Sequence, residues 1–532
     1  MIEVARKGAQ PQSVTMRAAS GLLAMLLFMG FASARDGIDV GVDTEHPGTK
    51  LDRHVFGQFA EDLGTGLYGG IWVGRDSSIP NTRGIRNDVV AALKDLHVPV
   101  VRWPGGCFAD EYHWQDGIGP AAARRPQPNY NWGGVLESNE FGTDEFMDFA
   151  QQIGTEAYIS VNVGSGTVKE AADWLQYMTA DAGSAWGKQR AANGHPAPYR
   201  VAMLGLGNES WDCGGHMSAA EYSFQLKLYA RFVHNWNKAQ PMQRVAVGPN
   251  GAKTEYTEAV MKLWKDNADW DWGLEGLSLH SYTVGKWPPS WPATDFGEPD
   301  YAKSLAETLK MDELIRTHSA LMDQFDPQKK ISLVVDEWGV WLAPSKGSNP
   351  GFLQQQNSQR DAVLAALNLN IFSRHADRVR NANIAQMVNV LQAMILTDGP
   401  KMVLTPTYYV FRMYVPFQDA VMLPVQYAAG SYAVGDFKLP RVDIIAARTQ
   451  EGKIAVAITN VDAKQPATVQ VDLGKVSAKT ASGETLAAPK VDAVNTFDAP
   501  RTVVPKGVTV PVKTGRLTLT VPPASVTVLT TQ

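Results

Sequence analysis

The chain has 532 residues, of which 44% are hydrophobic and 19% are charged, a composition ordinary for a globular protein and unlike a disordered or fibrous one. At about 150 residues per domain, this length predicts roughly two to four domains. Lysine and arginine number 49 and aspartate and glutamate 54, which gives a net charge of −5. So small an imbalance gives no support to nucleic-acid binding, which needs a strongly basic face.

The first predicted element is a secretory signal peptide over residues 1–34. Arg17 precedes a short apolar run at 21–31, and Ala32-Ser33-Ala34 forms an Ala-x-Ala cleavage site. The run is too short to span a bilayer comfortably, and the alternative is a short N-terminal anchor. We therefore expect a bacterial export signal, a periplasmic or secreted mature chain, and no membrane association after cleavage.

From about residue 53 to 420, short apolar runs alternate with segments whose apolar residues recur at i, i+3 and i+4. Eight such alternations favour a closed (β/α)8 TIM barrel over an open sheet. The expected strands are 55–60, 98–103, 157–163, 201–207, 244–247, 276–280, 331–337 and 384–390. The expected helices are 87–96, 144–153, 168–180, 218–238, 254–267, 304–325, 361–375 and about 408–414.

After residue 420 the composition changes to Val and Thr in period-2 alternation, which is typical of an antiparallel β-sandwich. The sandwich domain is expected over 421–532. Its expected strands are 453–459, 467–473, 508–512, 516–521 and 525–529. A further strand at 38–42, within the segment 35–52, is expected to join it.

Two cysteines, Cys107 and Cys213, are present. Two cysteines cannot form a disulfide scaffold, and no CxxC or Cys/His spacing predicts a zinc site. The sequence does not distinguish between one disulfide bridge and two free thiols.

Two predicted strands end in a carboxylate. The segment GLGNES ends one strand at Asn208 and Glu209, and SLVVDEWG ends another at Glu337. The strands are three units apart in a closed ring, so both carboxylates can face the mouth where barrel enzymes react. Two carboxylates across a cleft are what glycoside hydrolysis requires, one protonated and one ionised. Each acid alone could also be a structural residue at a strand end.

Four other predicted strands deliver polar groups to the same face. Each of these residues alone is as well explained by ordinary structural pairing, but six strands with polar ends are improbable in a purely structural protein. The residues are Glu61, Arg102 before a Pro-Gly-Gly turn, His280 with Tyr282, and Gln386.

These segments resemble the α-L-arabinofuranosidases of glycoside hydrolase family 51. The matching segments keep the family's order from about residue 54 to 420: VFGQFAEDLGTGLYGGIW, VVRWPGGCFADEYHWQDGIGP, LGLGNESWDCGG, LSLHSY, VVDEWGVW and IAQMVNVLQAMI, with a weaker match at FRMYVPFQDA. The Glu209 and Glu337 segments resemble patterns found across the wider clan. The segments around Glu61 and Arg102 are more particular to this family.

The resemblance implies a retaining double displacement with Glu337 as nucleophile and Glu209 as acid/base. The substrate would be terminal α-L-arabinofuranose on arabinoxylan, arabinan and their oligosaccharides, and no metal or cofactor would be needed. Arg102 falls on the arginine that holds the nucleophile. Sugar-binding or nucleophile-supporting positions fall on Glu61, Asn208, His280, Tyr282 and Gln386. The family resemblance is also compatible with a homo-oligomer.

Cys107 departs from this pattern, because some members carry an Asn there that bonds a sugar hydroxyl. A cysteine would be a weaker partner, and Asp110 is a candidate to compensate. Trp287, in a proline-rich loop, is a candidate for an outer sugar subsite or for a packed loop cluster. The rival functions are an endo-acting glucanase or xylanase on the same barrel and a non-catalytic carbohydrate-binding protein.

Overall fold

The computed structural model describes residues 37–269 and 273–532. The predicted signal peptide lies outside these residues. Within them, no helix is long and apolar enough to cross a membrane.

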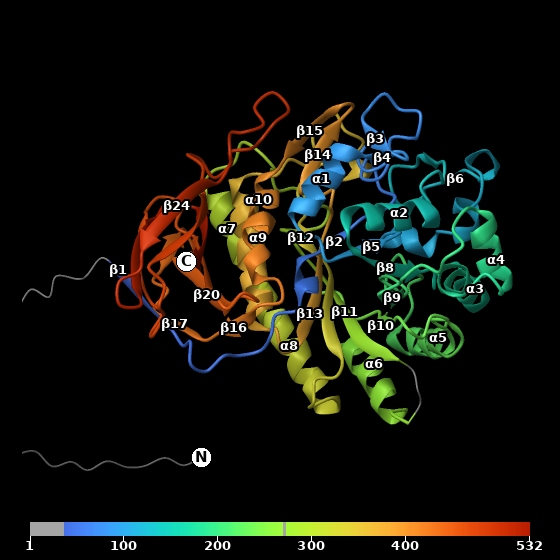
Figure 1. Cartoon of the computed structure of the whole chain (residues 1–532), viewed down its shortest axis with the longest axis horizontal. Coiled ribbons are helices and arrows are strands. Elements are labelled where there is room, and N and C mark those ends of the chain that lie inside the picture. The colour runs from blue at the N-terminus through green and yellow to red at the C-terminus, as the bar shows by residue number, and fades with distance from the viewer. Residues whose placement is uncertain (1–36, 270–272) are drawn as a thin grey trace, which may run out of the picture. The chain divides into compact units, whose positions relative to one another are not determined.

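Eight parallel strands close into a barrel, which confirms the predicted fold class (Figure 1). The second, fourth and seventh strands of the barrel in chain order show the pattern expected of barrel strands: every residue in them is buried. Helices cover the outside of such a barrel and side chains fill its inside, so its strands are apolar on both faces. In chain order the strands are β2 (Gly57–Phe59), β5 (Val100–Trp103), β8 (Glu156–Val161), β9 (Met203–Leu206), β10 (Gln243–Ala246), β11 (Leu274–Thr283), β12 (Ser332–Val340) and β13 (Val379–Ile384).

The helices begin at recognisable caps. The Thr167 and Ser218 hydroxyls each accept a hydrogen bond from a backbone N–H in the first turn of the helix that follows. The helices are α1 (Asn87–Asp95), α2 (Thr143–Ile153), α3 (Val168–Thr179), α4 (Ala185–Ala192), α5 (Ala219–Phe232), α6 (Glu255–Asp266), α7 (Glu298–Thr308), α8 (Lys310–Phe325), α9 (Gln359–Arg374) and α10 (Pro406–Met413). Short 3-10 turns are η1 (Arg53–Phe56), η2 (Cys107–Asp110), η3 (Trp114–Gly117), η4 (Ala121–Ala123), η5 (Pro350–Phe352) and η6 (Val415–Phe417).

Two helix predictions differ from the structure. The helix expected at 304–325 is two helices, α7 and α8, and α7 begins earlier, with Pro299 in its first turn. The helix expected at 218–238 ends at Phe232, because Val233 takes an extended backbone and buries its side chain. The short helix α4 was not predicted.

The eighth barrel strand lies before the position expected for it. It is β13, at 379–384, whereas the sequence predicted 384–390. Asn381 and Asn383 are buried polar residues of this strand, and their polarity hid it. The apolar segment after it is a buried loop, held by hydrogen bonds such as the one from the Gln392 N–H to the Ala385 carbonyl.

The C-terminal part forms two sheets. The first has the order β17-β1-β22-β25, with β1 parallel to β22 and the other pairs antiparallel; the second is antiparallel, in the order β16-β20-β21-β26-β23-β24. Their strands are β1 (Gly37–Val42), β16 (Val421–Leu423), β17 (Val425–Tyr427), β20 (Val442–Arg448), β21 (Ile454–Asn460), β22 (Ala467–Asp472), β23 (Thr480–Leu486), β24 (Lys506–Pro511), β25 (Arg516–Val521) and β26 (Ser525–Thr531). Small hairpins are β3–β4 (Asn81–Thr82, Ile85–Arg86), β6–β7 (Gln127–Pro128, Leu136–Glu137), β14–β15 (Ile395–Asp398, Lys401–Leu404) and β18–β19 (Tyr432–Val434, Phe437–Leu439).

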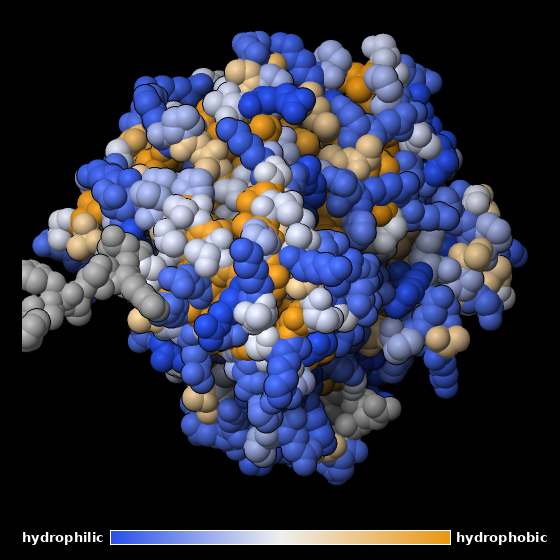
Figure 2. Space-filling model, turned by 60° about the vertical axis from the view of Figure 1, so that its left-hand side comes forward, coloured by the Kyte–Doolittle hydropathy of each residue, from blue (hydrophilic) through white to orange (hydrophobic). Residues whose placement is uncertain are grey.

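The second sheet packs against barrel helices α9 and α10, which lie between it and the barrel strands, and the β18–β19 hairpin packs against α7 (Figure 1). The Tyr301 hydroxyl donates to the Val461 carbonyl at 2.9 Å, and the Gln359 amide donates to the Ala524 carbonyl at 2.7 Å. Figure 2, turned to bring the C-terminal sheets forward, shows a mostly hydrophilic face with hydrophobic residues in small groups. The second sheet therefore packs on the outer side of the barrel helices.

Candidate active site

The carboxyl ends of the barrel strands bring the predicted polar residues together. The strands supply Arg102 from β5, His280 and Tyr282 from β11, and Glu337 from β12, and the segments just after β2, β9 and β13 supply the rest. Apart from Cys107, Trp287 and Tyr282, all of the predicted site residues are at least four-fifths buried. The set is Glu61, Arg102, Asn208, Glu209, His280, Tyr282, Glu337 and Gln386.

Glu337 is held by three polar side chains. Arg102 Nη1 donates to its Oε1 at 2.7 Å, and the Tyr282 hydroxyl donates to its Oε2 at 2.6 Å. His280 Nδ1 lies 3.6 Å from Oε2. Burial by itself raises the pKa of the Glu337 carboxyl, but the positive charges of His280 and Arg102 and the hydrogen bonds from Tyr282 and Arg102 outweigh it and lower the pKa. Glu337 is therefore an ionised carboxylate, as a nucleophile must be.

Glu209 has the opposite electrostatic setting. Its Oε1 lies 2.8 Å from His280 Nδ1. Burial raises the pKa of its carboxyl and outweighs the hydrogen bond and charge of His280, which lower it; the negative charges of Glu337 and Asp212 add a smaller increase. Glu209 also has a φ of +36°, in the left-handed region that few residues other than glycine adopt. A carboxyl with a raised pKa retains the proton that a general acid needs.

The two acids lie close together. One oxygen of Glu209, one nitrogen of His280 and one oxygen of Glu337 all lie within 4.8 Å of one another. Retaining glycosidases hold their two carboxyls about 5–5.5 Å apart, whereas inverting enzymes need about 6.5–9.5 Å to admit a water. The spacing here is that of direct attack by a carboxylate.

His280 lies between the two acids and responds to both. Burial lowers the pKa of its imidazole, but the carboxylate of Glu337 and the hydrogen bond to Glu209 outweigh this and raise it. A protonated His280 therefore stabilises whichever acid is ionised.

Arg102 joins Glu337 to the segment that bears Glu209. While Nη1 contacts Glu337, Nη2 donates to the Asn208 side-chain carbonyl at 2.6 Å. The guanidinium also lies over the Phe59 ring, 4.7 Å from its centroid. One buried cation therefore fixes Glu337 and the side chain next to Glu209.

Glu61 and Gln386 form a second polar group beside Glu337. Gln386 Nε2 donates to Glu61 Oε2 at 2.9 Å, and Trp132 Nε1 donates to Glu61 Oε1 at 2.9 Å. Burial, together with the charge of Glu337, raises the pKa of Glu61 to about 7. The sequence reasoning missed Trp132, which lies in a long loop with no strand end to mark it.

Gly106 lets the backbone approach Glu337. A Cβ at this position would lie 2.8 Å from Glu337 Oε1, closer than nonbonded atoms allow. The Gly106 N–H also donates to Glu61 Oε1 at 3.0 Å. The Pro-Gly-Gly turn after β5 therefore contacts both carboxylates: it packs closely against Glu337 and donates a hydrogen bond to Glu61.

Cys107 and Cys213 form a disulfide, which settles the alternative that the sequence left open. Cys107 begins η2, after β5, and Cys213 lies four residues after Glu209. The Cys213 sulfur is 3.7 Å from Glu209 Oε2. Cys107 consequently has no thiol to offer a sugar hydroxyl.

Asp110 ties together three loops around the site. Its Oδ1 accepts from the Val163 and Gly164 N–H groups at 2.9 and 2.8 Å, and its Oδ2 accepts from the Asn208 N–H at 3.2 Å. These contacts show that Asp110 holds the backbone of neighbouring loops in place; whether it also compensates for the absent Asn stays a prediction.

Trp287 lies at the outer end of an aromatic series. Its ring is 5.0 Å from Trp341, whose ring is 5.0 Å from Tyr282, and both contacts are edge-to-face. Trp287 is 70% exposed. The series therefore runs from the nucleophile's hydrogen-bond donor to solvent.

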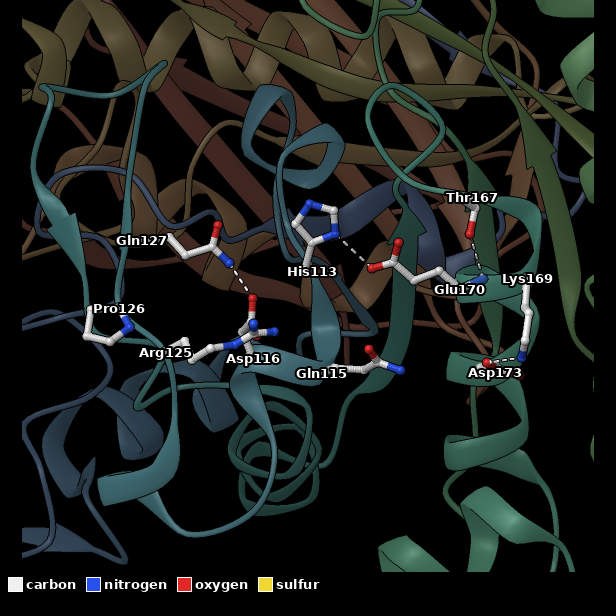
Figure 3. A pocket seen from close by; sticks show the side chains of 10 residues that line it. All are labelled: His113, Gln115, Asp116, Arg125, Pro126, Gln127, Thr167, Lys169, Glu170 and Asp173. Carbon is white, nitrogen blue, oxygen red and sulfur yellow. Dashed lines mark hydrogen bonds and ion pairs between the residues drawn. The ribbon is translucent and has the colours of Figure 1, made fainter.

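A separate cavity of about 630 Å³ lies between η3 and the start of α3 (Figure 3). Its charged groups pair with one another: His113 with Glu170, Arg125 with Asp116, and Lys169 with Asp173. None of the predicted catalytic or sugar-binding residues lines it. The predicted catalytic residues lie instead at the carboxyl ends of the barrel strands.

Known proteins resemble the chain over most of its length. Two sequence families match it, one described as an alpha-L-arabinofuranosidase 1 domain over residues 92–283 and one as an alpha-L-arabinofuranosidase C-terminal domain over residues 336–525. A protein of Bacteroides ovatus, named intracellular exo-alpha-L-arabinofuranosidase, is 43% identical over 89% of this chain and 91% of its own.

Solved structures agree with these sequence matches. The GH51 arabinofuranosidase from Xanthomonas axonopodis pv. citri has a TM-score of 0.90 and 49% identity, and covers 93% of this chain and 100% of its own. The arabinose complex of alpha-L-arabinofuranosidase from Thermotoga maritima has a TM-score of 0.82 and 29% identity, and covers 93% of this chain and 99% of its own.

Proposed function

The chain belongs to glycoside hydrolase family 51 as an exo-α-L-arabinofuranosidase, and from this premise we propose that Glu337 is its nucleophile and Glu209 its acid/base. The enzyme releases terminal arabinofuranosyl residues, and its family retains the anomeric configuration. The observation that carries the assignment is the pair of opposite pKa shifts on two carboxyls less than 5 Å apart. The endo-acting and non-catalytic alternatives have no comparable support.

In the first step the Glu337 carboxylate attacks C1 of the arabinofuranosyl group and forms a glycosyl ester. The bond from C1 to the aglycone oxygen breaks, and that oxygen takes the proton of Glu209. Glu209 is left ionised beside the protonated His280, 2.8 Å away. The cation therefore stabilises the charge that the step creates.

In the second step Glu209, now a carboxylate, removes a proton from water. The water oxygen attacks C1, the ester bond to Glu337 breaks, and arabinose leaves with its configuration retained. Arg102 and Tyr282 stabilise the released Glu337 carboxylate through the same hydrogen bonds that they donate to it in the free enzyme. Glu209 ends protonated and Glu337 ionised, ready for the next turnover.

The sugar contacts are part of the same proposal. Glu61, Asn208, His280, Tyr282 and Gln386 line the pocket that receives the arabinofuranosyl ring, and Trp287 contacts the next sugar of the chain. The natural substrates are then arabinose-bearing polysaccharides and oligosaccharides such as arabinoxylan and arabinan fragments.

We also propose that the mature enzyme is exported. The Ala-x-Ala segment at 32–34 and the Cys107–Cys213 disulfide support this, because disulfides persist in oxidising compartments. The Bacteroides ovatus relative is named intracellular, so the comparisons do not support export. Cell fractionation with a cytoplasmic marker tests it, and enzyme confined to the cytoplasm would overturn it.

The assignment of roles is tested with Glu337→Ala and Glu209→Ala on p-nitrophenyl α-L-arabinofuranoside, with the β-D-xyloside and β-D-glucoside as substrate controls. Glu337→Ala should lose turnover almost completely. Glu209→Ala should keep activity on activated aryl substrates and regain rate with azide, which forms a glycosyl azide of retained configuration. Glu451→Ala, at an exposed acid of the C-terminal sheets, is the matched control. An exchange of the two behaviours would reverse the assignment.

A further inference from the structure

We propose that the Cys107–Cys213 disulfide positions the acid/base residue. It holds the Glu209 carboxyl against the Cys213 sulfur, which carries no proton and cannot donate a hydrogen bond. This inference rests on the proposed role of Glu209. It assigns a catalytic consequence to Cys107, at which the sequence departs from the family pattern, and to its partner Cys213.

The disulfide joins the loop that lies against Glu337 to the loop that carries Glu209. Cys107 directly follows the turn whose Gly106 abuts Glu337, and Cys213 belongs to the turn that follows Glu209. That turn is closed by backbone hydrogen bonds from the Asp212 and Gly214 N–H groups to the Glu209 carbonyl, at 2.7 and 3.1 Å. The disulfide therefore anchors a compact turn and, with it, the acid.

Asp110 makes a second, separate connection between the same loops through the Asn208 N–H. Loss of the disulfide would consequently leave the loops connected. Its effect should fall on the side chain of Glu209, whose carboxyl the sulfur contacts, more than on the fold.

The two oxygens of Glu209 meet different surroundings. Oε1 faces His280 at 2.8 Å, and Oε2 faces the Cys213 sulfur at 3.7 Å. A disulfide sulfur carries no proton and cannot donate a hydrogen bond, so it excludes water from Oε2 without stabilising a negative charge there. A free Cys213 thiol in the same place would be a donor, and hydrogen bonding to the charged form lowers a carboxyl pKa.

The other groups that set the charge of Glu209 stay in place when the disulfide opens. They are His280 and Tyr282 on β11, Glu337 on β12 and Asp212 on the turn itself. Reduction by a dithiol transfers two electrons and two protons: the S–S bond breaks, two thiols form, and the reductant closes into its own cyclic disulfide. The net change beside Glu209 Oε2 is that the Cys213 disulfide sulfur, which carries no proton, becomes a thiol that can donate one.

The experiment compares the oxidised enzyme, the dithiothreitol-reduced enzyme and Cys107→Ala/Cys213→Ala on aryl α-L-arabinofuranosides of graded leaving-group pKa. EDTA is included because Cys107, Glu209 and Cys213 lie within 4.8 Å of one another and the freed thiols would attract trace zinc. Alkylation and mass measurement count the opened thiols.

If the disulfide positions the acid, kcat/KM should fall about 3–10-fold for the poorest leaving groups and less than about twofold for dinitrophenolate, since general acids contribute about 10²–10⁴-fold in all. The basic limb of the pH profile should move to lower pH, because Glu209 must be protonated to act. The acid limb should not move, because it reports Glu337 at pH values where Glu209 is already neutral. Reoxidation should restore the original profile.

If kcat/KM falls equally for all leaving groups and at all pH values, and Tm is lowered, the disulfide only stabilises the fold, and the proposal is overturned. Unchanged kinetics in an enzyme with two counted thiols would also overturn it. The reductant should not affect Cys107→Ala/Cys213→Ala, which controls for its other effects; if that variant does not fold, the reduced wild-type enzyme decides. Failure of azide to rescue Glu209→Ala would instead reject the role of Glu209 itself.

Discussion

The Arg102 guanidinium donates a 2.7 Å hydrogen bond to the Glu337 carboxylate, and both groups are buried. A second arm of the same guanidinium holds Asn208 at 2.6 Å. The pair therefore sets both the charge state of the nucleophile and its position relative to the acid.

Arg102→Lys keeps the positive charge but loses the planar fork, because an ammonium cannot reach both partners in this geometry. We expect kcat/KM to fall about 10²–10³-fold, as for removal of one strong transition-state donor. The acid limb of the pH profile should move to higher pH, since Glu337 loses a group that lowers its pKa. An unchanged acid limb would mean that Arg102 does not control the ionisation of Glu337.

Tyr282→Phe isolates one hydrogen bond to the nucleophile. The variant keeps the ring that packs against Trp341 and removes only the hydroxyl that donates to Glu337 Oε2 at 2.6 Å. The pKa of Glu337 should rise, so the acid limb should move up by about one pH unit or more, because a hydrogen bond to a charged group is worth about 1.5 kcal/mol or more and one pKa unit corresponds to about 1.4 kcal/mol. The basic limb, set by Glu209, should stay fixed. A pH titration of kcat/KM separates the two limbs.

Glu61 and Gln386 should behave as an exchangeable pair. Glu61→Gln places an amide against the Gln386 amide, so two donors can face each other across a contact that is now 2.9 Å. We expect each of Glu61→Gln and Gln386→Glu to lower kcat/KM about 10-fold or more, as buried polar groups lose their partners. The double exchange should recover part of this loss. A double variant no better than the product of the two single effects would show that the residues do not act as a pair.

Trp287→Ala tests the outer end of the aromatic series. Because Trp287 is exposed and lies beyond Trp341, its loss should raise KM for arabinoxylo-oligosaccharides about fivefold, the equivalent of about 1 kcal/mol of aromatic contact. Hydrolysis of the p-nitrophenyl substrate should change less than about twofold. Phe232→Ala, at another exposed aromatic residue, is the matched control. Equal effects on both substrates would place Trp287 outside the aglycone site.

The sequence predicts most of the site because its residues mark the ends of apolar strands. Glu209 and Glu337 follow runs of Met, Leu and Val that can only be buried, so their placement at the barrel mouth follows from the fold class. Trp132 could not be predicted in the same way, since its hydrogen bond to Glu61 spans 71 residues of loop and helix.

Other features depended on tertiary contacts. β13 was misplaced because Asn381 and Asn383 face the barrel interior, where Asn383 donates to Asp336 at 3.3 Å. The cysteine pairing needed the positions of two loops that lie 106 residues apart in sequence. Periodicity reports which residues are buried, but it does not report which loops meet.

His54 should make the stability of the fold depend on pH. It lies in η1, at the entrance to the barrel, with Nδ1 2.7 Å from Asp52 and Nε2 2.9 Å from Glu156. Burial lowers the pKa of this imidazole, but the two carboxylates outweigh burial and raise it to about 9. A folded pKa above the unfolded value of about 6.5 means that the stabilisation is fully present below pH 6.5 and is lost as the pH rises through about 9.

His54→Gln should therefore lower the free energy of unfolding by about 1–3 kcal/mol at pH 6, a range reduced from the full linkage value because the three side chains are partly exposed. Near pH 9.5 the difference should shrink, because the wild-type imidazole is then largely neutral. Denaturant unfolding at both pH values measures it. His46→Gln is the matched control, since His46 pairs with Asp43 on the surface with 81% of its side chain exposed and should contribute little. A His54→Gln deficit that is equal at both pH values would mean that packing of the ring, and not its charge, stabilises the entrance to the barrel.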